Sequence, residues 1–324
     1  MQYTTLGKTG LRVSVAGLGC GGNSRIGLGA GLPEAQSVAL VHAALDLGVN
    51  FLDTAAAYGT EELVGKAIKG RPRTNIVIST KSHINKNFGP QPMTAAEVVA
   101  NLDRSLRLLG TDYIDVFNLH GLSLKGYERA MLEIVPALLR EKEKGKFHHL
   151  GVTESGARDP EHTMLLHAAA EPCWAVFMLA LHMLHQNARF LLLPKTREKA
   201  IGTLCMFAVR NIFSKPEVLA NTLAQLAVEG RVPAGLGAGG DPLGFLVHEG
   251  GASSLTDAAY RYARHEEGID VVLFGTGSLA HLRANIASIL RPPLPEPDVL
   301  RLRDLFGKLV GVGLDLPDRI QQAR

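Results

Sequence analysis

Asn50-Phe-Leu-Asp53-Thr-Ala-Ala-Ala-Tyr58-Gly59 is the stretch around which the chain is organised. A short apolar run ends on the aspartate, and a tyrosine follows five residues later, beside a glycine. A carboxylate at the end of an apolar strand and a phenol on the next loop contribute little to folding, whereas both can take part in proton transfer. Two later apolar runs end in a similar way, residues 76–80 on Lys81 and residues 114–119 on His120. Three successive strand ends therefore supply Asp, Lys and His, with Tyr58 on the loop after the first.

Strand-like and helix-like segments alternate along most of the chain. We expect strands near 15–18, 50–53, 75–81, 114–119, 149–152, 175–179, 203–207 and 270–274, and helices near 33–47, 61–69, 94–109, 127–144, 161–170, 187–199, 256–265 and 279–290. Eight uninterrupted β/α units favour a closed (β/α)8 TIM barrel over an open sheet, in a single domain spanning residues 1–324. In such a barrel the carboxyl ends of the strands share one rim, where active sites lie. The polar residues at the strand ends should therefore meet there.

Three further segments lie outside the repeating units. Residues 3–6 and 11–13 flank a Gly-Lys-Thr-Gly turn and predict an N-terminal β-hairpin. A proline-rich stretch precedes an extra C-terminal helix near 298–312. The glycine-rich segment 230–254 has little periodicity and predicts a long loop, either a lid over the site or plain surface.

Composition excludes several classes of protein. Apolar residues make up 46% of the 324 residues, charged residues make up 20%, and the formal net charge is +3. This charge is too small to indicate a nucleic-acid or membrane-surface partner, and no apolar run approaches the length of a membrane span. The three cysteines lie far apart and show no disulfide or zinc-ligand spacing, and the first residues do not resemble a signal peptide. We expect a cytoplasmic protein without a bound metal; its oligomeric state stays open.

The four strand-end and loop residues form a chemically coherent set. A free tyrosine has a pKa near 10 and is a weak acid at neutral pH. A neighbouring ammonium stabilises the phenolate, and an aspartate beside that ammonium keeps it charged and fixed in position. A neutral imidazole can donate a hydrogen bond to the same substrate oxygen. Such a site delivers a proton to an oxygen that becomes an alkoxide, as hydride addition to a carbonyl requires.

The sequence resembles the aldo-keto reductases over essentially its whole length. The resemblance rests on the segment 51–59 with Glu61 and Gly65 beyond it, on Ser79-Thr-Lys81, on Leu108-Leu-Gly-Thr-Asp-Tyr-Ile-Asp-Val-Phe-Asn-Leu-His120, and on the opening residues 6–14. It implies a (β/α)8 barrel and a nicotinamide cofactor. It also implies that a catalytic tetrad is formed by Asp53, Tyr58, Lys81 and His120.

The resemblance also marks candidate cofactor contacts, several of which depart from the family pattern. Thr153 and Glu154 stand where the family carries a Ser-Asn pair that holds the nicotinamide carboxamide. Met178 stands where the family carries a glutamine that binds the same carboxamide. Phe207 replaces the tyrosine that stacks on the nicotinamide. The remaining expected contacts are Gly19 in the first glycine-rich loop and, around the last helix start, Thr276, Gly277, Ser278, His281, Arg283 and Asn285.

Cofactor choice is poised between NADP and NAD. Members specific for NADPH commonly place a lysine and an arginine at the positions of Gly275 and His281. Their absence here weakens selectivity for the 2′-phosphate of NADP. However, no acidic residue lies between 275 and 285 to bind ribose hydroxyls and repel a phosphate, and Arg283 remains nearby. We expect both cofactors to bind, with NADP(H) slightly preferred.

These features predict an oxidoreductase, an NAD(P)-dependent alcohol or aldose dehydrogenase. It would transfer a hydride between the cofactor and a small aldehyde, ketone or sugar-like hydroxy compound. The alternative is a cofactor-binding regulatory or redox-sensing subunit with little turnover; a barrel lyase is a more distant one.

Gly17-Leu-Gly-Cys-Gly-Gly22 matches the dinucleotide pattern of open sheets, but no helix begins at its last glycine, so that fold is not favoured. His182 lies near the predicted rim and is a candidate substrate contact.

Overall fold

Eight parallel strands close into a barrel in the order β10-β3-β4-β5-β6-β7-β8-β9. We analysed a computed structural model, which describes residues 1–86, 89–236 and 241–315. The barrel strands are β3 (Ala16–Gly19), β4 (Phe51–Asp53), β5 (Val77–Ser82), β6 (Ile114–Leu119), β7 (Phe147–Thr153), β8 (Val176–Ala180), β9 (Gly202–Met206) and β10 (Val271–Phe274). Each strand begins or ends within a few residues of its predicted position. The predicted TIM barrel is therefore confirmed.

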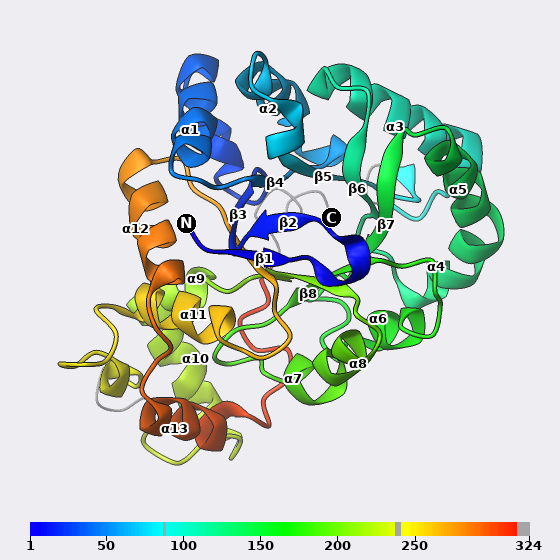
Figure 1. Cartoon of the computed structure of the whole chain (residues 1–324). Coiled ribbons are helices and arrows are strands. Elements are labelled where there is room, and N and C mark those ends of the chain that lie inside the picture. Colours follow the sequence, from blue (N-terminus) through cyan, green and yellow to red (C-terminus); the bar gives the residue numbers. More distant parts are fainter. Residues whose placement is uncertain (87–88, 237–240, 316–324) are drawn as a thin grey trace.

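Helices surround the barrel and cover its outer face (Figure 1). They are α1 (Glu34–Asp46), α2 (Glu61–Ile68), α3 (Ala95–Leu109), α4 (Leu124–Arg129), α5 (Val135–Glu143), α6 (Thr163–Ala168), α7 (Ala188–Leu191), α8 (Leu193–Glu198), α9 (Asn211–Ser214), α10 (Pro216–Val228), α11 (Leu255–Arg264), α12 (Leu279–Leu290) and α13 (Glu296–Phe306). The sequence prediction missed α9 and α10. It also treated α4 and α5 as one helix, whereas a π-helical turn (Ala130–Ile134) joins them. Pro136 explains this turn, because it has no N–H to donate to the preceding helical turn.

The N-terminal hairpin closes the end of the barrel opposite the strand carboxyl ends. Strands β1 (Tyr3–Thr5) and β2 (Arg12–Ser14) pair antiparallel and lie across the barrel end in Figure 1. The turn packs tightly against the start of β9: a Cβ on Gly7 would lie 2.2 Å from the backbone nitrogen of Gly202. Leu6 and Val13 are fully buried and join the apolar side chains inside the barrel. The opposite rim is thus left as the open end.

Strand register brings the predicted polar residues into one neighbourhood. Gly19 pairs with Asp53, and Asp53 pairs with Ser79, across three adjacent strands. Lys81 lies two residues beyond Ser79 on β5 and pairs with Asn118 on β6. Because side chains alternate along a strand, Ser79 and Lys81 project to the same face of β5. The barrel core below them is filled by apolar side chains of Phe51, Val77, Val116, Met178 and Leu204.

The C-terminal part packs beside the barrel. Helix α13 buries Leu302 and Phe306, and the side-chain amide of Gln186 donates a hydrogen bond to the Leu302 carbonyl. Within the predicted loop 230–254, Leu243 and Leu246 are fully buried. None of the described residues of this loop (230–236 and 241–254) lines either of the two cavities that open at the rim; residues 237–240 lie outside the described part.

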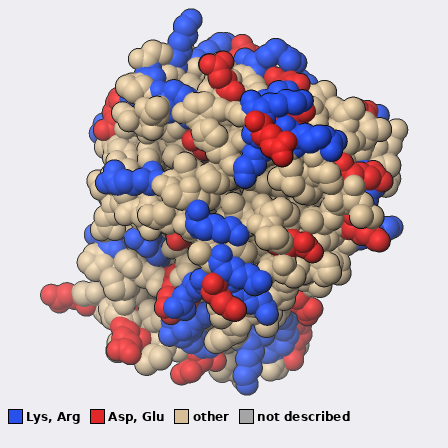
Figure 2. Space-filling model, turned by 45° about the vertical axis from the view of Figure 1, so that its right-hand side comes forward, with Lys and Arg blue, Asp and Glu red and all other residues tan. Residues whose placement is uncertain are grey.

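The molecular surface mixes both signs of charge. On the face in Figure 2, Lys and Arg lie interspersed with Asp and Glu, in keeping with the small net charge. No helix in the described ranges is long and apolar enough to cross a membrane.

Candidate active site

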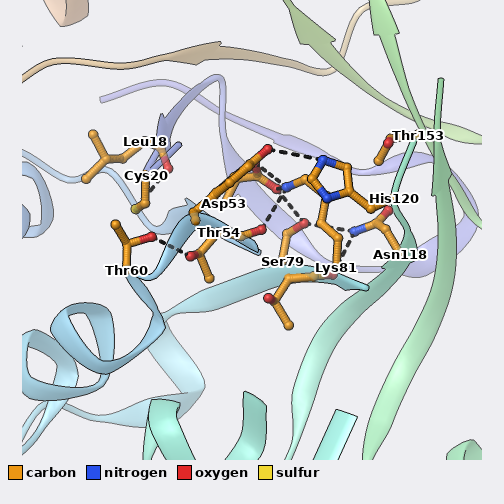
Figure 3. A network of polar contacts seen from close by, with 12 residues as sticks. Leu18, Cys20, Asp53, Thr54, Thr60, Ser79, Lys81, Asn118, His120 and Thr153 are labelled. Carbon is orange, nitrogen blue, oxygen red and sulfur yellow. Dashed lines mark hydrogen bonds and ion pairs between the residues drawn. The ribbon is translucent and has the colours of Figure 1, made fainter. Parts of the chain in front are cut away.

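A buried ion pair lies at the centre of the open rim. The Lys81 ammonium is 2.5 and 2.6 Å from the two carboxylate oxygens of Asp53, and it donates a third hydrogen bond of 2.8 Å to the Thr54 carbonyl. The Lys81 side chain is fully buried and that of Asp53 is 5% exposed. Since a buried charge without a partner is strongly destabilising, each residue compensates the buried charge of the other. Figure 3 shows this network at the ends of β4 and β5.

Two further polar residues fix the carboxylate. The Ser79 hydroxyl donates to Asp53 Oδ1 at 2.8 Å, and the Asn118 amide donates to the Ser79 hydroxyl at 3.0 Å. Both are fully buried. The sequence prediction omitted them, although Ser79 lies two residues before Lys81 and hence on the same face of the strand. The Asn118–Ser79–Asp53–Lys81 chain therefore orients the ammonium from three adjacent strands.

The phenol and the imidazole meet above this network. Tyr58 ends the short 3₁₀ helix Ala56–Tyr58, and His120 follows β6 directly. The Tyr58 hydroxyl is 3.4 Å from His120 Nε2, and the two rings are nearly perpendicular. The Lys81 ammonium lies 5.3 Å from the centroid of the Tyr58 ring. The four residues predicted from the strand ends thus come together at one place.

Glycine at position 21 lets the chain pass against the phenol. A Cβ there would lie 2.4 Å from Tyr58 Cε2 and 2.6 Å from Cζ, distances that real Cβ atoms do not adopt. From the same loop, the Arg25 guanidinium donates a 2.8 Å hydrogen bond to the Tyr58 carbonyl. The loop that follows β3 therefore holds Tyr58 both by packing and by hydrogen bonding.

A second histidine stacks on the first. The rings of His83 and His120 are 4.1 Å apart and within 17° of parallel. Burial lowers the pKa of His83 to about 4, and the nearby positive charges of Lys81 and Arg158 act in the same direction against a backbone hydrogen bond to His120. His83 is therefore a neutral ring at physiological pH. It was not predicted, although it lies two residues beyond Lys81.

Two adjoining cavities open beside Tyr58. The first, of about 510 Å³, is lined by Tyr58 and His120 and by the loops that follow β5, β6 and β7. The second, of about 350 Å³, runs from Asp53 and Tyr58 along the glycine-rich loop after β3 to Gly275 after β10. Tyr58 and Phe207 line both. The site thus offers one compartment for a small substrate and a contiguous one for an elongated ligand.

Some of the predicted cofactor residues line these cavities. Gly19 lines the second cavity, Thr153 the first, and Met178 and Phe207 line both. The Thr153 hydroxyl accepts a 2.7 Å hydrogen bond from the Gly121 backbone. Phe207 adopts a left-handed backbone conformation, with φ of 71°, that is rare for an aromatic residue. The Arg210 guanidinium lies 4.3 Å from the centroid of its ring.

Glu154 lines the first cavity but directs its carboxylate into the protein. One oxygen lies 2.8 Å from His162 Nδ1, and the other accepts a 2.7 Å hydrogen bond from the Ala180 backbone. Burial by itself lowers the pKa of His162, but the Glu154 carboxylate outweighs this effect and the pKa is raised. The expected contact between the Glu154 side chain and a nicotinamide carboxamide therefore has no support in this geometry. Sequence reasoning missed His162, eight residues away across a loop.

The predicted contacts around the start of α12 lie apart from the two cavities. Thr276, Gly277, Ser278, His281, Arg283 and Asn285 line neither of them. The Thr276 hydroxyl accepts from the Ser278 backbone, and Ser278 caps the helix. A Cβ on Gly277 would lie 2.9 Å from Gly27 Cα, so the loop after β3 packs on this helix start. His281 and Arg283 are exposed and follow Gly275, at the end of the second cavity, by six and eight residues in the sequence.

The proposed substrate contact of His182 is wrong. Its side chain is fully buried and lines neither cavity. Its ring lies 5.3 Å from that of Phe213 and 5.9 Å from that of His185, which in turn accepts a hydrogen bond from the Gly311 backbone. These histidines fasten the segment after α13 to the barrel. Among the described residues, no cluster of His, Cys, Asp and Glu has the arrangement of a metal site.

Comparison with known proteins agrees with this geometry. The model of the "Aldo/keto reductase family" matches residues 17–305. The chain belongs to the aldo/keto reductase family. It is an oxidoreductase of that family, whose members typically use NAD(P)H and act on small molecules.

The individual proteins that this chain resembles share a modest fraction of its sequence. L-galactose dehydrogenase from Arabidopsis thaliana is 26% identical over 298 residues, which cover 89% of this chain and 88% of the relative. Aldo-keto reductase YhdN from Bacillus subtilis is 38% identical, but over only 130 residues, or 37% of this chain and 38% of the relative. The holo form of aldo-keto reductase AKR11C1 from Bacillus halodurans superposes with a TM-score of 0.73 at 21% identity, over 97% of this chain and 100% of that one. The structural likeness supports the fold.

Proposed function

We propose that this aldo/keto reductase family member transfers a hydride between NADP(H) or NAD(H) and a small aldehyde, ketone or sugar-like hydroxy compound. The observation that carries the proposal is the meeting of Tyr58 Oη and His120 Nε2, 3.4 Å apart, where the two rim cavities join. A carbonyl oxygen placed between these two atoms has a proton donor and a hydrogen-bond donor on one side. When bound, the nicotinamide supplies or accepts the hydride.

Each member of the tetrad has a separate role in the proposal. Tyr58 gives its hydroxyl proton to the oxygen as it becomes an alkoxide, and it takes a proton back in the oxidation direction. Lys81 stabilises the phenolate that remains, because its ammonium is held behind the Tyr58 ring by Asp53. His120 orients the substrate oxygen. His83, neutral and stacked on His120, fixes the plane of the catalytic imidazole.

The part of the second cavity beside Tyr58 is suited to the nicotinamide of the cofactor. Gly19, Gly21 and Gly22 keep side chains out of the cavity wall, and Phe207 and Met178 supply apolar surface beside Tyr58. A Cβ on Gly275 would lie 3.2 Å from Ser24 Oγ, so glycine allows the two loops to approach at the far end. We propose that the exposed residues His281 and Arg283 near that end contact the adenosine part, with Thr276, Gly277, Ser278 and Asn285 completing the helix start.

The substrate proposal draws on a relative as well as on the cavity. A relative whose match covers 89% of this chain is named L-galactose dehydrogenase. A cavity of about 510 Å³ that contains both polar and apolar lining residues accommodates a molecule of that size. The tetrad serves oxidation and reduction equally, so the reaction can be assayed in either direction.

One observation favours the alternative of a regulatory or redox-sensing subunit. Two of the side chains with which the family holds the carboxamide are replaced here, one by Met178 and one by Glu154, whose carboxylate binds His162 and the Ala180 backbone. A nicotinamide ring held without these contacts could bind in a pose that reacts slowly. Binding of the cofactor with no turnover of any carbonyl compound would select this alternative.

A spectrophotometric screen at 340 nm tests the proposal. The protein is assayed with NADPH and NADH against aldehydes, ketones and aldoses, and with NADP and NAD against the corresponding alcohols and sugars. We expect turnover with at least one class that is abolished by Tyr58→Phe. No turnover in either direction, with cofactor binding shown by fluorescence, would reject the enzymatic proposal.

A further inference from the structure

The loop between β7 and α6 carries an arginine into the first cavity. Arg158 lines this cavity together with Tyr58 and His120. Its positive charge contributes to lowering the pKa of His83, the ring that stacks on His120. Arg158 is therefore electrostatically coupled to the catalytic end of the cavity although it lies on the outer loop.

The loop is built to hold this position. At its base, the Glu154 carboxylate and the His162 imidazole join the two ends of the segment 154–162 through a fully buried contact of 2.8 Å. His162 is further held by Asn187, whose side-chain amide donates to the Pro160 carbonyl inside the same loop. Two buried side chains thus fix where the loop begins and ends. This gives the Glu154–His162 pair a role other than binding a cofactor.

The middle of the loop is fixed as well. The backbone N–H groups of Arg158 and Asp159 both donate to the Ser155 carbonyl, which forms a tight turn. The two carboxylate oxygens of Asp159 accept hydrogen bonds of 2.9 and 2.8 Å from the backbones of Thr163 and Met164 at the start of α6. The backbone beneath Arg158 is therefore restrained on both sides.

Arg158 is a charged residue of this cavity for which the described part of the chain supplies no partner. Four side chains of the lining carry a formal charge: Glu154, Arg158, Asp159 and Arg210. Glu154 is paired with His162, Asp159 caps α6, and Arg210 forms an ion pair with Asp315. Within the residues described by the structure, the guanidinium of Arg158 has neither an ion-pair partner nor a hydrogen bond. Among the described lining residues, the Arg158 guanidinium is thus available to a ligand in the cavity.

We propose that Arg158 binds a carboxylate on the substrate, so that the preferred substrates are acidic carbonyl or hydroxy compounds such as oxo acids and sugar acids. This proposal rests on the proposed function, because it assigns the far end of the same substrate. A planar guanidinium matches a carboxylate with two parallel hydrogen bonds, which sets the orientation of the molecule as well as its affinity. The reacting carbon would then lie at Tyr58 and the carboxylate at Arg158.

Matched pairs of substrates test the proposal. Galacturonate and galactose differ only in a carboxylate in place of a hydroxymethyl group, and succinic semialdehyde and butanal form an open-chain pair. We expect kcat/KM of the wild type to favour the acidic member by about tenfold or more, the effect of a hydrogen bond to a charged group at an accessible site. Arg158→Met should remove this preference through KM, and Arg158→Lys should restore part of it. The exposed Arg140 on α5 provides the control, because Arg140→Met removes the same charge elsewhere and should leave the preference intact.

Two outcomes would overturn the proposal: equal kcat/KM for the two members of each pair, or a preference that Arg158→Met leaves unchanged. Titration calorimetry of galacturonate and galactose with the protein gives a second readout that does not depend on turnover. Tighter binding of galacturonate that is lost in Arg158→Met supports the carboxylate site even if hydride transfer is never observed. No difference in binding rejects it while leaving the proposed oxidoreductase function standing.

Discussion

The backbone of Gly21 lies against the ring of Tyr58, so closely that a Cβ at position 21 would be 2.4 Å from Tyr58 Cε2. Gly21→Ala must therefore displace the phenol or the loop after β3. Because a misplacement of about 1 Å can reduce the rate about 10²-fold, we expect kcat to fall by about 10- to 100-fold while the fold persists. Steady-state kinetics and circular dichroism measure the two effects.

A double mutant separates this steric effect from a general disturbance. If Gly21→Ala acts through Tyr58, adding it to Tyr58→Phe should reduce the rate little further, since the hydroxyl is already absent. Additive losses in the double mutant would show that Gly21 acts elsewhere, for example on the neighbouring cofactor cavity.

The lysine should control the pH dependence of reduction. Lys81→Met removes the cation held behind Tyr58, so we expect a slower reaction whose pH profile is displaced relative to the wild type. The substitution also leaves Asp53 as a buried charge without its partner, which costs about 3–5 kcal/mol of stability. Lys81→Met combined with Asp53→Asn avoids that charge and should show the same displaced profile. An unchanged profile in the double variant would mean that the ion pair is only structural.

Cofactor preference should be modest. Members specific for NADPH commonly carry a lysine and an arginine at the positions of Gly275 and His281, and their absence here removes charge-assisted contacts. However, no carboxylate between 275 and 285 repels a 2′-phosphate. We expect NADPH to bind about tenfold more tightly than NADH, which corresponds to about 1.4 kcal/mol. Arg283→Ala should reduce NADPH affinity and leave NADH affinity unchanged, whereas Arg140→Ala should alter neither. Fluorescence titration decides between these results; a clear NADH preference would contradict the prediction.

Acid should destabilise the folded protein through its buried histidines. Burial lowers the pKa of His185 to about 3, and the positive charge of His162 acts in the same direction. The pKa of His185 in the folded protein therefore lies below its unfolded value near 6.5, and the folded state favours the neutral ring. The contribution of this neutral ring to the free energy of unfolding is fully present above pH 6.5 and is lost as the pH falls toward 3. At pH 5 the loss amounts to about 2 kcal/mol for one such group.

His185→Asn tests this assignment because asparagine retains an acceptor for the Gly311 backbone. The free energy of unfolding in urea, measured at pH 8 and pH 5, should decrease less in the variant than in the wild type. An equal decrease in both proteins would show that His185 is not among the groups responsible.

The barrel and the meeting of the four strand-end and loop residues were predictable because they depend on local patterns. Each barrel strand is a short apolar run, and Asp53, Lys81 and His120 stand directly at the ends of such runs. Helix α10 also carried a signal that was missed, since Leu219, Leu223 and Leu226 recur at helical spacing and Pro216 opens the helix. The sequence prediction did not recognise this pattern, which lies directly before the glycine-rich loop.

The residues that were not predicted depend on tertiary contacts. Glu154 matched the family position of a cofactor contact, but the direction of its side chain is decided by His162, which reaches it across a loop from α6. Arg158 has no special position in sequence. Its significance depends on a cavity that several loops form together, where no partner for its guanidinium is found among the residues that the structure describes. His182 was placed near the rim correctly, yet the segment after α13 covers it.

The central claim is that Tyr58 supplies the proton, and Tyr58→Phe tests it most directly. The substitution keeps the ring against Gly21 and removes only the hydroxyl, so cofactor affinity measured by fluorescence should change by less than about twofold. Hydride transfer, followed at 340 nm in a single turnover with cofactor already bound, should slow by about 10²-fold or more. A variant that binds cofactor normally and reacts at close to the wild-type rate would contradict the account.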